Sequence, residues 1–167
     1  MKRLLVLRHA EAVPKDAADD FDRVLSARGR NQMAAVARHL AGAAEVPDGA
    51  LVSPAARTRE TWSRAGLDPV PFRTDERIYE ASPDDLLAVL RDGDDLATSL
   101  VLVGHNPGLH DAARALLAAG ADGDLRRLAE FPTACLAEFE LDTGSWRELS
   151  WRTGRLLSLV TPADLGA

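Results

Sequence analysis

The sequence is poor in cysteine, in lysine and in long apolar runs. Its one cysteine, Cys135, cannot form a disulfide within the chain, and no group of cysteines and histidines has the spacing of a zinc site. Because Cys135 lies in the strand-like run PTACLAEFEL, we expect a buried structural thiol rather than a catalytic one. We therefore expect neither a metal site nor a cofactor.

No apolar run approaches the length of a membrane span, and the run that follows Arg3 stops at Arg8, too early for a secretory signal. The net charge of −6 argues against a general nucleic-acid binder, although it allows a local basic pocket. Only Lys2 and Lys15 are lysines, so arginine, the better residue for bidentate anion binding, carries most of the positive charge. A composition bias of the source genome would have the same effect. We expect a cytoplasmic protein with no nucleic-acid or membrane partner.

The length and the pattern of elements predict one α/β domain. The chain has 167 residues, of which 46% are apolar and 28% charged, which fits a single domain over residues 1–167 and, by default, a monomer. Short apolar runs at 3–7, 50–53 and 99–104 predict strands covered on both faces, and helical patterns lie between them. We therefore expect a mostly parallel sheet flanked by helices. Residues 133–152 predict an appended C-terminal hairpin with its turn at 142–145.

Four helix starts are predicted from capping residues. Ser26 precedes a helical pattern over 27–42, and the pairs Ser53-Pro54, Ser82-Pro83 and Asn106-Pro107 each place a capping residue before a proline. The acidic segment 16–22, which lies in a long irregular stretch, is interpreted as a solvated loop.

Basic residues follow each predicted strand at the point where it ends. Arg8 and His9 follow the first strand, Arg57 lies one helical turn beyond the second, and His105 follows the third. In open α/β sheets, ligands bind beyond the carboxyl ends of the strands. Guanidinium groups, imidazoles and helix N-termini gathered there suit a phosphoryl group. The sequence thus predicts an anion pocket at this edge.

Each of these residues alone also has an ordinary structural interpretation. An Arg-His pair after a strand is usually a loop, a histidine before a helix is usually a cap, and an arginine early in a helix is usually exposed. Their coincidence at one sheet edge favours a site. His39 and His110 lie within predicted helices and are interpreted as structural, and a metal held by His9 and His105 would have no recognisable third ligand.

Four segments carry a family resemblance. LVLRHAEA, LVSPAARTRET, RIYEASPDDLL and LVLVGHNPGL, in this order, resemble the histidine phosphatase superfamily with its phosphoglycerate mutase-like fold, over roughly residues 3–110. The short chain, the DRVLSARGRNQ segment and the GHNPGL run are most similar to the SixA-type phosphohistidine phosphatases. Ala10 stands where many members have glycine, which favours the same branch.

The resemblance implies a role for each residue of the pocket. His9 matches the nucleophile, which becomes a transient phosphohistidine. Arg8 and Arg57 match the phosphate-binding arginines. His105 matches a second histidine that binds phosphate and stabilises the group in transfer.

Two further positions are less specific. Arg23 matches an additional phosphate-binding arginine, with an ion pair to Asp20 or Asp22 as the alternative. Glu80 matches the general acid of phosphatase and mutase relatives, Glu11 is a rival for that role, and either could simply be solvated. An imidazole that leaves from phosphohistidine needs less help from an acid than an alkoxide does.

The function expected from the resemblance is a metal-independent phosphatase with a covalent phosphohistidine intermediate, whose partner is a phosphorylated protein dephosphorylated at histidine. The alternative is a phosphatase of a small phosphomonoester, such as a sugar phosphate or a nucleotide, which would depend on Glu80. A third interpretation, a silent module that binds phosphorylated partners, is disfavoured because all four core residues are present. Dinucleotide binding fits poorly, since no glycine-rich phosphate loop occurs.

Overall fold

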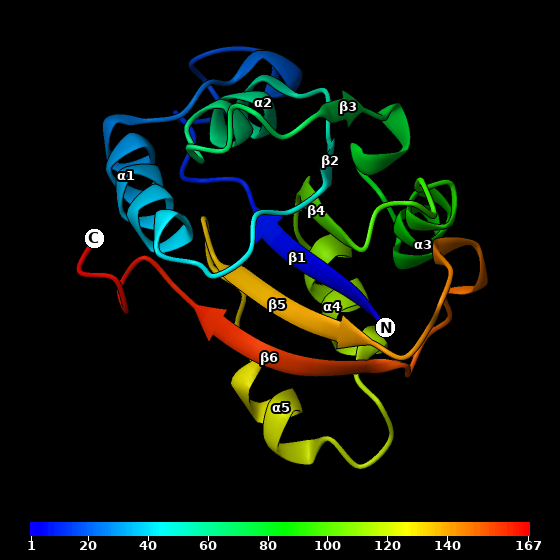
Figure 1. Ribbon diagram of the computed structural model, residues 1–167. Helices are drawn as coiled ribbons and strands as arrows, with labels where there is room; N and C mark the ends of the chain where they lie inside the picture. The colour runs from blue at the N-terminus through cyan, green and yellow to red at the C-terminus, as the bar shows by residue number, and fades with distance from the viewer.

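Six strands form one sheet in a computed structural model that describes residues 1–167 (Figure 1). Their spatial order is β3-β2-β4-β1-β5-β6. The first four pair in parallel, and β5 runs antiparallel to both β1 and β6. The bounds are β1 (Lys2–Arg8), β2 (Gly49–Val52), β3 (Phe72–Thr74), β4 (Ser99–Gly104), β5 (Leu136–Leu141) and β6 (Gly154–Val160). The predicted α/β class is confirmed.

Helices cover both faces of the sheet. α1 and α2 lie on one face, and α3 and α4 lie on the other (Figure 1). None of the helices has both the length and the apolar character that a membrane span requires. The bounds are α1 (Ala27–Ala41), α2 (Ala56–Ser63), α3 (Pro83–Arg91), α4 (Gly108–Leu116) and α5 (Asp122–Arg127), with 3₁₀ turns η1 (Asp20–Asp22), η2 (Glu76–Ile78) and η3 (Trp146–Glu148).

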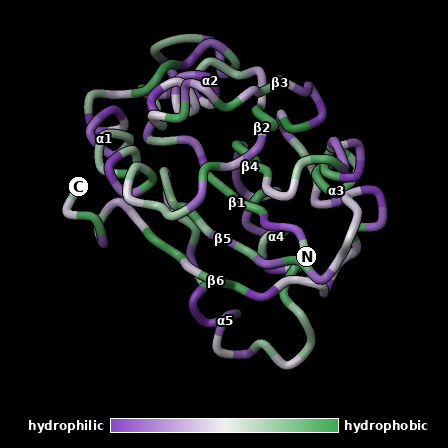
Figure 2. The backbone as a smooth tube through the Cα atoms, viewed as in Figure 1, coloured by the Kyte–Doolittle hydropathy of each residue, from purple (hydrophilic) through white to green (hydrophobic).

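Alternate residues of the central strands fill two separate cores. Leu4 and Val6 of β1 pack in the cluster under α3 and α4, whereas Leu5 and Leu7 pack in the cluster under α1 and α2. All four are buried, and each contributes about 1.5–3 kcal/mol by leaving water. Because both faces are covered, β1 and β4 read as continuous apolar runs, which form the hydrophobic centre in Figure 2.

Two of the predicted helix caps are confirmed. The side chain of Ser26 accepts a hydrogen bond from the backbone N–H of Gly29 at the start of α1. Ser82 forms a capping box with Asp85 at the start of α3. Such a cap contributes about 1 kcal/mol to the stability of its helix.

The other two predicted caps are wrong. α2 and α4 begin beyond the proline, and neither preceding polar side chain caps its helix. The Oγ of Ser53 lies 2.7 Å from Nε2 of His105. The Nδ2 of Asn106 donates to the carbonyl of Phe131 at 2.7 Å. Both side chains instead form hydrogen bonds with residues that are distant in the sequence. A local sequence pattern does not reveal such contacts.

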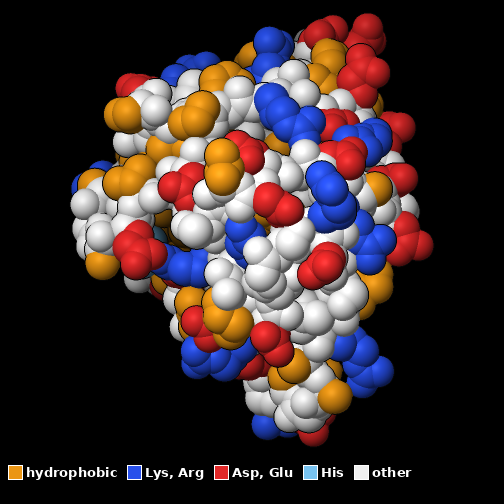
Figure 3. All heavy atoms as spheres, turned by 45° about the vertical axis from the view of Figure 1, so that its right-hand side comes forward, with side chains coloured by type: hydrophobic (Ala, Val, Ile, Leu, Met, Phe, Trp, Pro, Cys, Tyr) orange, Lys and Arg blue, Asp and Glu red, His pale blue; other side chains and the backbone are white.

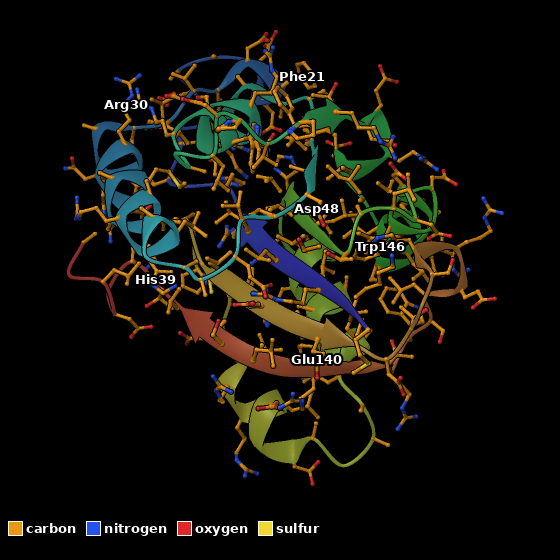
Figure 4. The ribbon with its side chains drawn as sticks, viewed as in Figure 1. Phe21, Arg30, His39, Asp48, Glu140 and Trp146 are labelled. Carbon is orange, nitrogen blue, oxygen red and sulfur yellow. The ribbon has the colours of Figure 1, made fainter.

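The C-terminal hairpin is present, but its predicted tight turn is wrong. β5 and β6 are joined by residues 142–153, so the second strand starts at Gly154. The connection contains Trp146, which is fully buried and donates its indole N–H to the carbonyl of Ala97 (Figure 4). Burial of so large a side chain outweighs its strand propensity. β3 was not predicted, because its three residues are all exposed and show no apolar pattern.

The surface mixes charges of both signs. On the face drawn in Figure 3, basic and acidic side chains are intermixed. Arg77, for example, pairs with both Asp75 and Asp92. Exposed pairs of this kind each contribute little to stability.

Candidate active site

A cleft of about 660 Å³ opens at the carboxyl ends of the parallel strands. β1 and β4 are in register up to Arg8 and Gly104, so the residues that follow them emerge side by side. The fold therefore brings together residues that are distant in the sequence. All six predicted site residues line the cleft: Arg8, His9, Arg23, Arg57, Glu80 and His105.

The imidazole of His9 is buried and held in one tautomer. Only 8% of the His9 surface is exposed, and Nδ1 lies 2.7 Å from the carbonyl oxygen of Ala10. A carbonyl only accepts hydrogen bonds, so Nδ1 carries the proton and donates. The lone pair is therefore on Nε2, which makes this atom the nucleophilic nitrogen of the ring.

His9 is also electrically neutral near pH 7. Burial, followed by the positive charges of Arg57, Arg8 and Arg23, lowers its pKa to about 4, although the hydrogen bond to Ala10 opposes the shift. A neutral imidazole keeps its lone pair available for attack.

His105 is a second neutral imidazole beside the first. The two ring centroids are 5.3 Å apart. Burial, the neighbouring His9 and the positive charge of Arg57 lower the pKa of His105 to about 3. Its Nε2 is hydrogen-bonded to Ser53 Oγ, and its buried Nδ1 has no partner within the chain. Ser53 was not among the predicted site residues, although it follows β2 at the same edge.

Arg57 reaches the cleft from the first turn of α2 and is only 6% exposed. Its Nη1 donates to the backbone carbonyl of Asp20 at 2.7 Å, and its Nη2 donates to Oδ2 of the same residue at 3.2 Å. Thr61, one turn further on, accepts from the N–H of Ala10 and donates to the carbonyl of Arg57. α2 is thereby tied directly to the loop of the buried imidazole.

Arg8 is held by a backbone carbonyl of the segment that precedes β5. Its Nη1 donates to the carbonyl of Phe131 at 3.1 Å, an acceptor that it shares with Asn106. Its buried Nε has no partner within the chain. Burial lowers the pKa of this guanidinium, which stays protonated at any ordinary pH.

Arg23 lines the cleft and is also paired, as its alternative interpretation required. Its Nε and Nη2 donate to Oδ1 of Asp20 at 3.2 and 3.0 Å, and its Nη1 donates to the carbonyl of Val13. The partner is Asp20 rather than Asp22. Residues 16–22 are all exposed, as expected of a solvated loop, but Asp20 also lines the cleft, where it is bound by Arg23 at the end of its own turn and by Arg57 of α2.

The two candidate acids have different surroundings. Glu80 is exposed at the cleft, with a positive φ of 55°. Glu11 accepts hydrogen bonds from Ser26 through Oε1 and from Arg28 through Oε2, so its carboxylate is bound at the start of α1. The geometry favours Glu80 over Glu11 as a group that could meet a ligand. No cluster of three or more histidine, cysteine or acidic side chains is arranged to hold a metal ion.

Cys135 is buried and free, in line with the structural thiol expected from its sequence context. Burial raises its thiol pKa to about 12, so the reactive thiolate is scarce near pH 7.

Because His9 is buried and neutral, we expect the free energy of unfolding to decrease in acid. Below the ordinary histidine pKa of 6.5 the unfolded chain takes up a proton at this position, while the folded chain does so only near pH 4. Stability should therefore fall as the pH decreases through this window. Between pH 7 and pH 5 the loss due to His9 is roughly 2 kcal/mol. Urea unfolding at both pH values should show a smaller loss for His9→Asn than for the unsubstituted protein; equal losses would contradict the assignment.

Comparisons with known proteins agree on one family. Residues 4–89 match the family model of the histidine phosphatase superfamily (branch 1). A protein of Mycobacterium leprae, named only as uncharacterized, is 30% identical over 162 residues, which cover 93% of this chain and 99% of that protein.

Two solved structures share the fold. One, of a proposed phosphohistidine phosphatase SixA from Nakamurella multipartitia, superposes with a TM-score of 0.87 at 24% identity and covers 96% of each chain. Another, of a proposed phosphohistidine phosphatase SixA from Agrobacterium tumefaciens, has a TM-score of 0.81 at 27% identity, covering 96% of this chain and 98% of that one.

Proposed function

This chain belongs to the histidine phosphatase superfamily, and from that premise we propose that it hydrolyses phosphoryl groups through a phosphohistidine formed on His9. One observation carries the proposal. A buried, neutral imidazole with its lone pair on Nε2 lies in a cleft lined by three guanidinium groups. A nucleophile and an anion site are thus combined in one place.

In the first step Nε2 of His9 attacks the phosphorus atom of the substrate. The N–P bond forms as the bond to the leaving group breaks, and the bonding electron pair departs with the leaving group. Arg8, Arg57 and His105 stabilise the charge on the phosphoryl oxygens. The proton stays on Nδ1, which donates it in a hydrogen bond to the carbonyl of Ala10, and this bond keeps the ring oriented during attack.

In the second step a water molecule attacks the phosphorylated His9. The P–Nε2 bond breaks, its electron pair returns to the imidazole, and a proton of the water is released as inorganic phosphate forms. The neutral ring is regenerated in the tautomer that the Ala10 carbonyl selects. No step requires a metal ion or a cofactor.

The substrate class we propose is phosphohistidine on a protein. The names of the two structures of similar fold support this class. Glu80 is exposed at the cleft, and the exposed Phe21 packs against Tyr79 of the cleft lining (Figure 4), so both can contact a protein that carries the phosphohistidine. An imidazole leaving group also needs little assistance from an acid.

The test compares two substrates, a phosphohistidine-bearing protein and a small aryl phosphate, each with and without a chelator. We expect turnover that the chelator does not change, with the higher kcat/KM for the protein substrate. A higher kcat/KM for the aryl phosphate would favour the phosphomonoester alternative. Turnover that requires an added metal ion would contradict the proposal, and binding without any phosphoenzyme would favour a silent module.

Glu80 separates the two substrate classes. If it protonates an oxygen leaving group, Glu80→Gln should lower kcat toward an alkyl phosphate by about 10²–10⁴-fold. Toward phosphohistidine the loss should be far smaller, because imidazole leaves without that proton. Glu76→Gln, an exposed position outside the cleft, is the matched control and should change neither rate. Equal losses on both substrates would argue against an acid role for Glu80.

A further inference from the structure

Asp20 joins three side chains that line the cleft. Arg57 donates to its backbone carbonyl and to Oδ2, and Arg23 donates twice to Oδ1. The hydroxyl of Tyr79 donates to Oδ2 at 2.6 Å. Asp20 comes from the η1 turn, Arg57 from α2 and Tyr79 from the segment after η2, so one carboxylate links segments far apart in the sequence.

Asp20 uses only one edge of the Arg57 guanidinium. Both of its contacts are to the terminal nitrogens Nη1 and Nη2. The Nε–H of Arg57 is buried without a partner in the chain. A guanidinium has five N–H donors in a planar fork and can bind one carboxylate at its end while its Nε side binds a second anion. Asp20 therefore fixes the plane of this group and leaves the Nε side for a ligand.

Tyr79 extends the same network to the second imidazole. Its ring packs edge-on against His105 at 5.6 Å and against Phe21 at 5.3 Å, and the guanidinium carbon of Arg57 lies 6.0 Å from its centroid. The hydrogen bond from Tyr79 to Asp20 thus fixes the Tyr79 ring between η1 and the cleft.

Asp20 is the acidic group of the cleft that contacts its arginines. It is bound by Arg23 and Arg57. The other charged side chains of the lining are those of Arg8, Lys15, Glu11 and Glu80. The carboxylate remains ionised, because the Tyr79 hydroxyl and the two arginines hold its pKa well below the usual range. Asp20 is therefore unsuited to act as a general acid.

We propose that Asp20 is a positioning residue that aims the guanidinium groups of Arg57 and Arg23 at the phosphoryl oxygens. This role rests on the proposed function and deepens it. The obvious alternative is that Asp20 competes with phosphate for the same donors. The two ideas predict opposite signs: removal of a competing negative charge strengthens phosphate binding, whereas loss of the positioning contacts weakens it.

The experiment measures the Kd of inorganic phosphate by calorimetry for the full chain and for Asp20→Asn. Without the carboxylate the two guanidinium groups lose the contacts that orient them toward phosphate, so we expect the Kd to rise about tenfold or more, although the cleft has gained positive charge. Asp22→Asn removes the same charge from the same turn, at an exposed residue outside the cleft lining, and should leave the Kd within about twofold.

Two further variants separate positioning from a general loss of structure. Asp20→Glu restores the carboxylate and should recover part of the affinity, which a purely structural defect of the turn would not show. Tyr79→Phe removes one donor and leaves the carboxylate in place, so its Kd should lie between those of the parent and Asp20→Asn. Thermal unfolding of each variant checks that the fold is retained.

The outcomes are distinguishable. Phosphate binding by Asp20→Asn that equals or exceeds that of the parent overturns the positioning role and leaves the proposed function intact. A parent protein that binds no phosphate and forms no phosphoenzyme overturns the proposed function, and the role of Asp20 with it. Weaker binding by Asp20→Asn, with partial recovery in Asp20→Glu, supports both.

Discussion

Replacing His9 with asparagine is expected to reduce phosphatase turnover by about 10⁴-fold or more, the scale seen when a nucleophile is removed. Asparagine keeps a side-chain N–H that can reach the carbonyl of Ala10, so the loop has a means to retain its shape. It has no nucleophilic nitrogen, because the amide lone pair is delocalised. Steady-state hydrolysis of an aryl phosphate measures the loss, and acid-quenched incorporation of labelled phosphate measures the phosphoenzyme.

The control for this prediction is another histidine of the same chain. His39 lies on the exposed side of α1, away from the cleft (Figure 4), so His39→Asn should retain full activity. Residual turnover in His9→Asn above about one part in a hundred would mean that another group attacks phosphorus. A labelled phosphoenzyme in that variant would identify a different nucleophile.

Replacing Arg57 with alanine should lower kcat/KM by about 10³-fold. The side chain supplies charge-assisted hydrogen bonds to the phosphoryl oxygens, each worth about 1.5–3 kcal/mol, in a site that is largely shielded from water. Its removal also frees Asp20 from one of its two arginines. Arg57→Lys keeps the charge without the planar fork, so most of the loss should remain.

Arg59 provides the matched control. It lies two positions further along the same helix, where the side chain is exposed to solvent and does not line the cleft. Arg59→Ala removes the same charge from α2 and should change kcat/KM by less than about twofold. If both alanine variants lost activity equally, the effect would come from the charge of the helix and not from contact with phosphate.

The local sequence pattern determined the main elements and their order. Continuous apolar runs predicted β1, β2 and β4, because a strand covered on both faces has no polar positions. Ser26 and Ser82 predicted helix starts correctly, because a cap is made by residues only three apart. The short exposed strand β3 was not predicted, because only Phe72 of its three residues is apolar and they form no apolar run.

The pocket was predictable because topology alone brings its residues together. Arg8 ends β1 and His9 follows it, Arg57 lies in the first turn of the helix after β2, and His105 follows β4. Parallel strands end at the same edge of the sheet. Glu11 illustrates the limit of this reasoning. Its place near His9 made it a candidate acid, yet its carboxylate is bound by Ser26 and Arg28.

The sequence by itself thus determined that this is an α/β protein with two histidines and two arginines at one sheet edge. Only the tertiary structure decided which nitrogen of His9 bears the proton, that Ser53 meets His105, and that the acidic turn places Asp20 among the arginines. The physical reason is the distance along the chain between the groups that interact. Strand and helix patterns arise from neighbours along the chain, whereas burial, tautomer and charge pairing depend on groups that only folding brings within a few ångströms.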